Sequence, residues 1–261
     1  MVNLLPTHLI QKLYKHMKKN KEKIIFTGGS GKFGKVFKQL NSQYEIYYPS
    51  KNRLDITNIK KCNSYVKKIK PTYLIHCAAL SRPMQIHDKD IKKSINLNII
   101  GTGNIVKVCK NYKVKLIYFS SNYVYPGFKG NYDENSPVLP FNNYGWSKLG
   151  GECSVHMYKN SLILRICMTE KPFIHKKAFI DLNTNFMFHE ELAKILIKVI
   201  KKKGILNIGG KVQSVYNFAK RYNKNVKKIS AKKLYGKKYP LNQSMNVRKY
   251  TIIKNKTSIK N

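Results

Sequence analysis

The sequence predicts an α/β protein, a doubly wound parallel sheet of the Rossmann type with a small C-terminal substrate-binding annex. Short apolar runs such as KIIFT (23–27) and SLILRI (161–166) lack the polar alternation of strands that have one face in water. Runs of this kind are typical of parallel strands that helices cover on both faces. They alternate with segments of helical period, as strand–helix–strand crossovers require.

The expected elements follow this order along the chain. The first strand, 23–27, leads through a glycine-rich turn into a helix that runs to residue 40. Further strands are expected at 44–48, 72–79, 115–121 and 161–166, with helices at 57–69, 88–111 and 143–159. After an irregular segment at 167–187, we expect a helix at 188–203, a strand within 204–210 and a helix at 214–222.

We divide the chain into three parts on this pattern. Residues 1–22 form an N-terminal extension with an amphipathic helix over 1–20, and 23–166 form a dinucleotide-binding domain that carries the catalytic helix. Residues 167–261 form a reduced substrate-binding annex, interleaved with the sheet, and a basic tail.

Composition narrows the classes of function. The 261 residues contain five scattered cysteines without a Cys-x-x-Cys pair, which indicates a reducing compartment and no zinc site. The seven histidines lack metal-ligand spacing, and no apolar run approaches the roughly 18 residues that span a bilayer. The N-terminus lacks the layout of a signal peptide. We expect a soluble, cytoplasmic, metal-free protein that does not bind membranes.

The net charge of +39 is unusual, since 51 basic residues stand against 12 acidic ones. Such a surplus commonly indicates contact with nucleic acid. Here the lysines are spread over nearly all expected helices, and arginine, which nucleic-acid readers favour, is scarce. We therefore expect no specific nucleic-acid partner, and the same field would attract a small anionic substrate.

The turn TGGSGKFG (27–34) predicts a dinucleotide site. Glycines allow a tight turn, a close approach of backbone to a pyrophosphate and close packing of helix on strand, and the helix N-terminus faces the phosphates. Gly28, Gly31 and Gly34 occupy those places. The loop residues that we expect to contact the cofactor are Gly28, Ser30, Gly31, Lys32, Phe33 and Gly34.

The end of the second strand selects between NAD and NADP. An acidic residue there would bind the adenosine ribose hydroxyls of NAD, whereas basic residues suit the additional phosphate of NADP. The sequence reads YYPSKNRLDIT, with Lys51 and Arg53 at this position, although a lysine is weak evidence in so basic a chain. We expect NADPH to be preferred over NADH.

The stretch YGWSK places Tyr144 four residues before Lys148, on one face of an expected helix. This spacing recurs at five other tyrosines, so it proves nothing alone. Only this pair follows a strand that ends in Ser120 and Ser121, at the edge of the sheet where ligands bind.

These motifs together resemble the extended short-chain dehydrogenase/reductase superfamily. The segment FSSNYVYPGFKGNYDENSPVLPFNNYGWSKLGGE, with NLNIIGTGNIV and YPLNQSMNV, is similar to reductases of nucleotide-linked 4-keto-6-deoxysugars, of the dTDP-4-dehydrorhamnose reductase type. The likeness extends from about residue 23 to 250. It implies NADPH-dependent reduction of the C4 keto group of a UDP- or dTDP-linked 4-keto-6-deoxyhexose, which can carry a 2-acetamido group.

The resemblance also implies roles for matching residues. Tyr144 would be the general acid, Lys148 would lower the phenol pKa and hold the nicotinamide ribose, and Ser121 would fix the carbonyl. The further cofactor contacts would be Asp55, Ile56, Ala78, Ala79 and Asn98, and the substrate contacts Asn122, Tyr123 and Arg165.

Several alternatives stay open. Asn98 is equally typical of a residue that kinks a helix, Tyr123 of strand-end packing, and Arg165 of a structural ion pair. Asn122 replaces the Asp common in these reductases, and the segment after Arg165 is short. The other functions to weigh are a nucleotide-sugar epimerase or dehydratase and a non-catalytic NADP-binding regulatory subunit, since the beta subunit of methionine adenosyltransferase resembles the same reductases. A homodimer is also left open.

Overall fold

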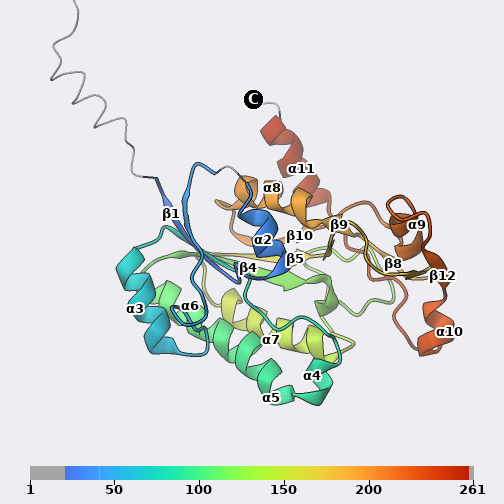
Figure 1. Cartoon of the computed structure of the whole chain (residues 1–261), viewed down its shortest axis with the longest axis horizontal. Coiled ribbons are helices and arrows are strands. Elements are labelled where there is room, and N and C mark those ends of the chain that lie inside the picture. The colour runs from blue at the N-terminus through green and yellow to red at the C-terminus, as the bar shows by residue number, and fades with distance from the viewer. Residues whose placement is uncertain (1–20, 41, 259–261) are drawn as a thin grey trace, which may run out of the picture.

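The computed structural model describes residues 21–40 and 42–258 (Figure 1). The helix expected over 1–20 lies outside these residues. The centre is a six-stranded, all-parallel sheet in the order β10-β5-β4-β3-β1-β2, which confirms the doubly wound fold class. Its strands are β1 (Lys23–Thr27), β2 (Glu45–Tyr47), β3 (Tyr73–His76), β4 (Lys115–Ser121), β5 (Ser161–Ile166) and β10 (Gly204–Ile208).

Helices cover both faces of the sheet (Figure 1). Alternate strand residues point to opposite faces, so Ile24 and Phe26 of β1 join one buried cluster and Ile25 joins another. On the Phe26 side lie α2 (Lys32–Phe37), α8 (His189–Val199) and α11 (Arg248–Ser258); on the Ile25 side lie α3 (Ile59–Ile69), α6 (Gly101–Asn111) and α7 (Asn143–His156).

The strand order changes direction at β1, because β2 lies on one side of it and β3 on the other. The switch point of the sheet therefore lies between β1 and β3, at the carboxyl ends of these strands. Ligands of doubly wound proteins bind at this switch point.

The prediction of one continuous helix over 88–111 is wrong. The structure has α4 (Ile86–Lys89), a break at Asp90, α5 (Ile91–Ser94) and a π-helical segment η1 (Ile95–Ile100) before α6. Asp90 has the non-helical φ of −135° and its side chain accepts a hydrogen bond from the Lys93 amide. The aspartate caps a new helix instead of continuing the old one.

The annex adopts short strand pairs, and some of these strands lie within 167–187, where the sequence predicted irregular chain. These strands are β6 (Met168–Thr169), β7 (Lys177–Phe179), β8 (Asn183–Thr184), β9 (Met187–Phe188), β11 (Gln213–Ser214) and β12 (Lys227–Ile229), with helices α9 (Val215–Lys220) and α10 (Ala231–Tyr235). Phe173, Phe188 and Phe218 fill its own core. No helix in the described ranges is long and apolar enough to cross a membrane.

Candidate active site

The glycine turn after β1 has the geometry of a phosphate-binding loop. Gly28 has a φ of +81°, which favours glycine, and its carbonyl accepts a hydrogen bond from the Gly31 amide at 3.0 Å. A Cβ on Gly34 would lie 2.6 Å from the Gly28 oxygen. The turn can therefore bring exposed backbone at Ser30 and Gly31 against an anion, and the residues present fit a dinucleotide diphosphate.

Side chains of this loop divide between the core and the solvent. Phe33 is 3% exposed and packs against Phe26 and Phe119, so only its backbone is left for a ligand. Lys32 is exposed and its Nζ lies 2.6 Å from Oε2 of Glu170.

Lys51 and Arg53 are both exposed in the turn that follows β2. The carboxylate of Asp55 accepts hydrogen bonds from the amide and hydroxyl of Thr57, and Ile56 is buried. Ala78 and Ala79 follow β3, and a Cβ on Gly28 would lie 2.8 Å from the Ala78 amide nitrogen. The loops of β1 and β3 therefore meet at the switch point.

Ser121 and Tyr144 are brought together by the start of α7. Asn142 caps this helix by accepting a hydrogen bond from the Gly145 amide at 2.8 Å. A Cβ on Gly145 would lie 2.4 Å from the Tyr123 carbonyl oxygen, so glycine lets α7 lie directly against the turn η2 (Asn122–Val124) that ends β4. Tyr144 thereby comes close enough to Ser121 for the serine hydroxyl to lower the pKa of the phenol.

Tyr144 is partly exposed and lies between two other rings. The Tyr123 ring centre is 5.6 Å away, edge-on, and the His87 ring centre is 5.2 Å away. Burial raises the pKa of Tyr144, and the hydrogen bond with Ser121 and the charge of Arg82 only partly offset this. The phenol is therefore protonated at neutral pH.

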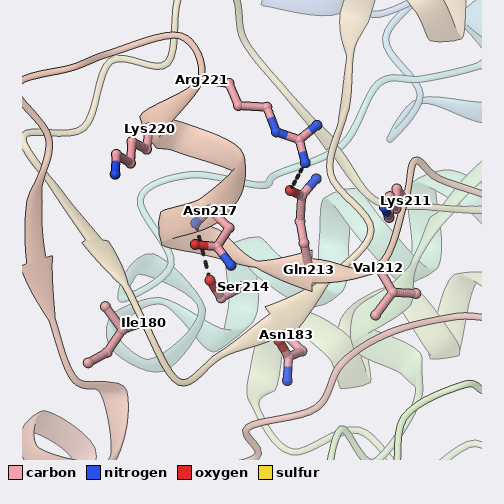
Figure 2. A pocket seen from close by; sticks show the side chains of 9 residues that line it. All are labelled: Ile180, Asn183, Lys211, Val212, Gln213, Ser214, Asn217, Lys220 and Arg221. Atoms are coloured by element: carbon pink, nitrogen blue, oxygen red, sulfur yellow. Dashed lines mark hydrogen bonds between the residues drawn. The ribbon is translucent and has the colours of Figure 1, made fainter.

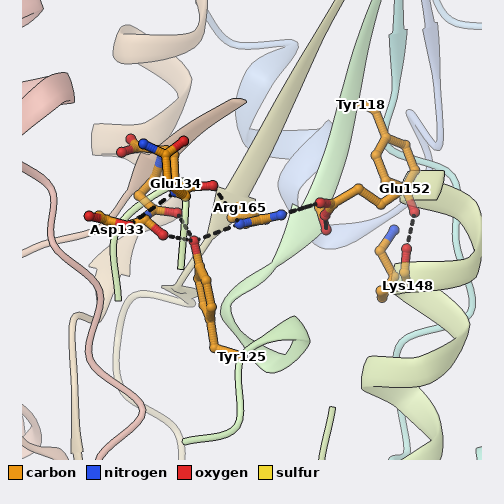
Figure 3. Close-up of polar contacts among 10 residues, drawn as sticks. Tyr118, Tyr125, Asp133, Glu134, Lys148, Glu152 and Arg165 are labelled. Atoms are coloured by element: carbon orange, nitrogen blue, oxygen red, sulfur yellow. Dashed lines mark hydrogen bonds and ion pairs between the residues drawn. The ribbon is translucent and has the colours of Figure 1, made fainter. Parts of the chain in front are cut away.

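Lys148 lies one helical turn further and is 3% exposed. Its Nζ is 4.3 Å from the centre of the Tyr118 ring, and the Tyr118 hydroxyl donates to the Lys148 carbonyl at 3.1 Å (Figure 3). Burial lowers the pKa of Lys148 to about 8, because the ammonium loses its hydration. The lysine still carries its charge at neutral pH.

Arg165 is placed in a buried ion pair. Its guanidinium donates to Oε1 of Glu152 through Nε (3.0 Å) and NH2 (2.6 Å), and through NH1 to the Tyr125 hydroxyl at 2.8 Å (Figure 3). Both side chains of the pair are 5% exposed. This geometry favours the structural alternative over a substrate contact. Ser120 donates to the other oxygen of Glu152, so it also belongs to this network.

Asn98 is likewise used by the fold. It is 1% exposed, exchanges two hydrogen bonds with the Leu80 backbone and donates to the Ser147 hydroxyl at 2.8 Å. It therefore braces α7 one residue before Lys148, and it lies in the π-helical segment η1.

The expected substrate contacts differ in their exposure. Asn122 is 4% exposed and donates to the Gln243 carbonyl at 3.4 Å, whereas Tyr123 is partly exposed and also packs on Phe141.

Two residues of the site, Arg82 and His87, were missed from the sequence. Arg82 follows β3 and its NH1 lies 2.6 Å from Oε1 of Glu170. His87 is 1% exposed; its Nδ1 is 2.7 Å from the Ser94 hydroxyl, while its Nε2 has no partner. The only available signal was the unusual wording of the segment after the third strand, SRPMQIHD.

A separate cavity of about 780 Å³ opens in the annex (Figure 2). Lys211, Lys220 and Arg221 line it together with polar side chains that include Asn183. The Asn183 carbonyl accepts a hydrogen bond from the Gln243 amide, and the Gln243 carbonyl accepts one from Asn122. Hydrogen bonds through Asn183 and Gln243 thus link the wall of the cavity to Asn122, which follows β4. No group of three or more potential metal ligands occurs in the described part of the chain.

Comparison with known proteins assigns the chain to a family. The family model described as the RmlD substrate binding domain matches residues 22–171. The chain belongs to this family. The match covers the glycine loop, Ser121, Tyr144 and Lys148, and it ends just after the segment that contributes Glu170.

Curated relatives of two kinds each match about half of the chain. Methionine adenosyltransferase 2 subunit beta of Xenopus tropicalis is 32% identical over 152 residues, 54% of this chain and 45% of the relative. The dTDP-4-keto-6-deoxy-D-glucose reductase of Streptomyces niveus is 28% identical over 138 residues, 50% of this chain and 46% of the relative. The chain spans just under half the length of these curated relatives.

Solved structures match over most of the chain. The dTDP-4-dehydrorhamnose reductase of Bacillus anthracis, solved in complex with NADP, has a TM-score of 0.80 at 26% identity and covers 89% of this chain and 92% of its own. An orthologue from Clostridium acetobutylicum, with a TM-score of 0.78 at 22% identity over 90% of this chain and 92% of its own, shares the fold.

Proposed function

We propose that this protein is an NADPH-dependent reductase of a nucleotide-diphosphate-linked 4-keto-6-deoxyhexose. The observation that carries the proposal is the joint position of Ser121, Tyr144 and Lys148 at the carboxyl end of the sheet, where the end of β4 meets the start of α7. NADPH would supply the hydride. The similarity to a dTDP-4-dehydrorhamnose reductase solved with NADP supports the cofactor, and the glycine loop fits its diphosphate.

Each group of the triad has a chemical task in this reaction. Ser121 donates a hydrogen bond to the C4 carbonyl oxygen and fixes it next to Tyr144. Tyr144, protonated at neutral pH because burial raises its pKa, gives its proton to that oxygen as negative charge develops. Lys148 is charged below a pH of about 8, and it stabilises the phenolate that remains.

Discrimination between the cofactors is assigned to Lys51 and Arg53. Both are exposed after β2, at the place where the adenosine ribose binds in this fold. No acidic side chain takes the position of a ribose ligand in that turn, and Asp55 is occupied by Thr57. The two cations therefore favour the additional phosphate of NADPH.

The annex supports an anionic substrate larger than a simple ketone. Arg165 is engaged in the ion pair with Glu152 and is not free to bind a ligand. The nucleotide diphosphate is therefore assigned to the annex cavity, which is lined by Lys211, Lys220 and Arg221. The attraction is not selective for the sugar, so a 2-acetamido group and the base, uracil or thymine, are left to experiment.

A non-catalytic regulatory subunit is the second candidate. The specific observation in its favour is the 32% identity to methionine adenosyltransferase 2 subunit beta. That role would need cofactor binding but no proton donor. The complete triad supports the reductase over it, and the missing carboxylate at Asn122 gives no support to an epimerase or dehydratase.

The triad is tested with Tyr144→Phe and a matched control. Tyr216 precedes Lys220 by four residues on α9, so Tyr216→Phe removes the same hydroxyl from the same motif away from the triad, at a side chain that is not among those lining the annex cavity. Loss of a general acid lowers kcat by about 10²- to 10⁴-fold, while cofactor affinity should stay within about twofold. We expect this loss in Tyr144→Phe and nearly full activity in Tyr216→Phe, measured as NADPH oxidation with a dTDP-linked 4-keto-6-deoxy sugar. Equal kcat in Tyr144→Phe and wild type would remove Tyr144 from the reaction.

A further inference from the structure

Glu170 links two cations that come from different loops. Its Oε2 lies 2.6 Å from Nζ of Lys32 and its Oε1 lies 2.6 Å from NH1 of Arg82. Glu170 itself follows β6, so a third segment of the chain holds both cations. Partial burial works against ionisation of Glu170, but the hydrogen bond from Lys32 and the charge of Arg82 outweigh it and lower its pKa.

This bridge lies over the switch point of the sheet. Lys32 is the first residue of α2 after the glycine turn, and Arg82 lies six residues beyond the end of β3. The two strands are neighbours, paired from Ile24 with Tyr73 to Thr27 with His76. The carboxylate therefore joins the two loops between which a dinucleotide diphosphate binds in doubly wound folds.

The three side chains are accessible and can change partners. Lys32 is 61% exposed, Arg82 50% and Glu170 17%. Ion pairs at such exposure are weak, because water competes for both charges. A diphosphate carries more negative charge than one carboxylate and presents several acceptor oxygens. It would therefore displace the Glu170 carboxylate from the same two cations.

We propose that Glu170 is a built-in competitor for the cofactor diphosphate, which must displace its carboxylate from Lys32 and Arg82 in order to bind. The inference rests on the proposed function and names the cations of this site that receive the diphosphate. Glu170 would then also set the affinity for the cofactor. Its carboxylate keeps the two cations in place, and the free energy needed to break its two ion pairs weakens cofactor binding.

The test is titration of NADPH against Glu170→Gln, followed by the change in NADPH fluorescence. Two exposed ion pairs would weaken binding by about two- to thirtyfold, so Glu170→Gln should bind NADPH that much more tightly. Glu191→Gln is the matched control, since it removes the same charge from α8 and should leave affinity within about twofold. A thermal unfolding curve shows that each variant is folded.

The cations supply the second half of the test. In the double variant Lys32→Met/Arg82→Met, NADPH should bind more weakly than to wild type. Adding Glu170→Gln to this double variant should change the affinity by less than about twofold, because the two cations for which the carboxylate and the diphosphate compete are absent. Unchanged or weaker NADPH binding by Glu170→Gln alone would overturn the proposal. Weaker binding would mean that the ion pairs of Glu170 help to retain the cofactor. Failure of both wild type and Glu170→Gln to bind NADPH would overturn the cofactor assignment and this inference with it.

Discussion

Two carboxylates hold cations at the carboxyl edge of the sheet, and their surroundings differ. Glu152 and Arg165 are each 5% exposed, and the Arg165 donors are shared among Glu152, Tyr125 and the Glu134 carbonyl. Glu170 meets Lys32 and Arg82 at the rim, where both cations are at least half exposed. The buried pair has no freedom to bind a ligand, while the rim group can exchange partners. Of these two clusters, the ligand contact is therefore assigned to the one whose cations water can also reach.

The largest difference between the two clusters is expected in the stability of Arg165→Met. Removing one partner leaves the Glu152 carboxylate buried and unpaired, which costs about 3–5 kcal/mol of unfolding free energy. The double variant Glu152→Gln/Arg165→Met should lose less than the single one, because no uncompensated charge is left. At the rim, Glu170→Gln should cost less than about 1 kcal/mol. Chemical denaturation measures all three, and a loss below about 1 kcal/mol in Arg165→Met would make the two clusters equivalent.

Lys148 sharpens the comparison, because it is a buried cation whose Nζ packs on the Tyr118 ring. Its folded-state pKa of about 8 is below the ordinary value of 10.5, so the unfolded chain binds the proton more tightly. Burial of the charge therefore opposes folding below about pH 8, and the penalty is relieved as pH rises from about 8 to 10.5.

Lys148→Met should then raise the unfolding free energy at neutral pH by about 1–3 kcal/mol while abolishing activity. The gain in stability should shrink between about pH 8 and 10.5. In wild type, kcat/KM should fall as pH rises through about 8, because the ammonium is lost. A stability gain that is the same at both ends of this range would contradict the assignment.

The smallest effect concerns the exposed cations after β2. Replacing Lys51 and Arg53 together with Ala should weaken NADPH binding by about tenfold and leave NADH binding nearly unchanged, since each exposed contact is modest. Parallel titrations with the two cofactors measure this. Native protein that prefers NADH would instead point to Asp55 as a ribose contact.

The sequence predicted the strands of the sheet, and the helix that carries Tyr144 and Lys148, because these depend on local patterns. KLIYFSS (115–121) forms β4 within its predicted bounds, and the four-residue spacing of Tyr144 and Lys148 survives on α7. The environment of Arg165 depends on residues up to 40 positions away, and the bridge of Arg82 spans 88 positions. Such pairings depend on the packing of the annex, which no local period reports. An arginine inside the apolar run SLILRI was the available signal for a buried pair.

The most direct test of the reductase assignment follows the hydride itself. Wild type and Tyr144→Phe are incubated with dTDP- or UDP-linked 4-keto-6-deoxy sugars and NADPH that carries deuterium at the transferable position of the nicotinamide. We expect the deuterium to appear at C4 of the sugar with wild type, and transfer at least about a hundredfold slower with Tyr144→Phe. Tight binding of NADPH without transfer of deuterium to any of these sugars would contradict the reductase and favour the regulatory subunit.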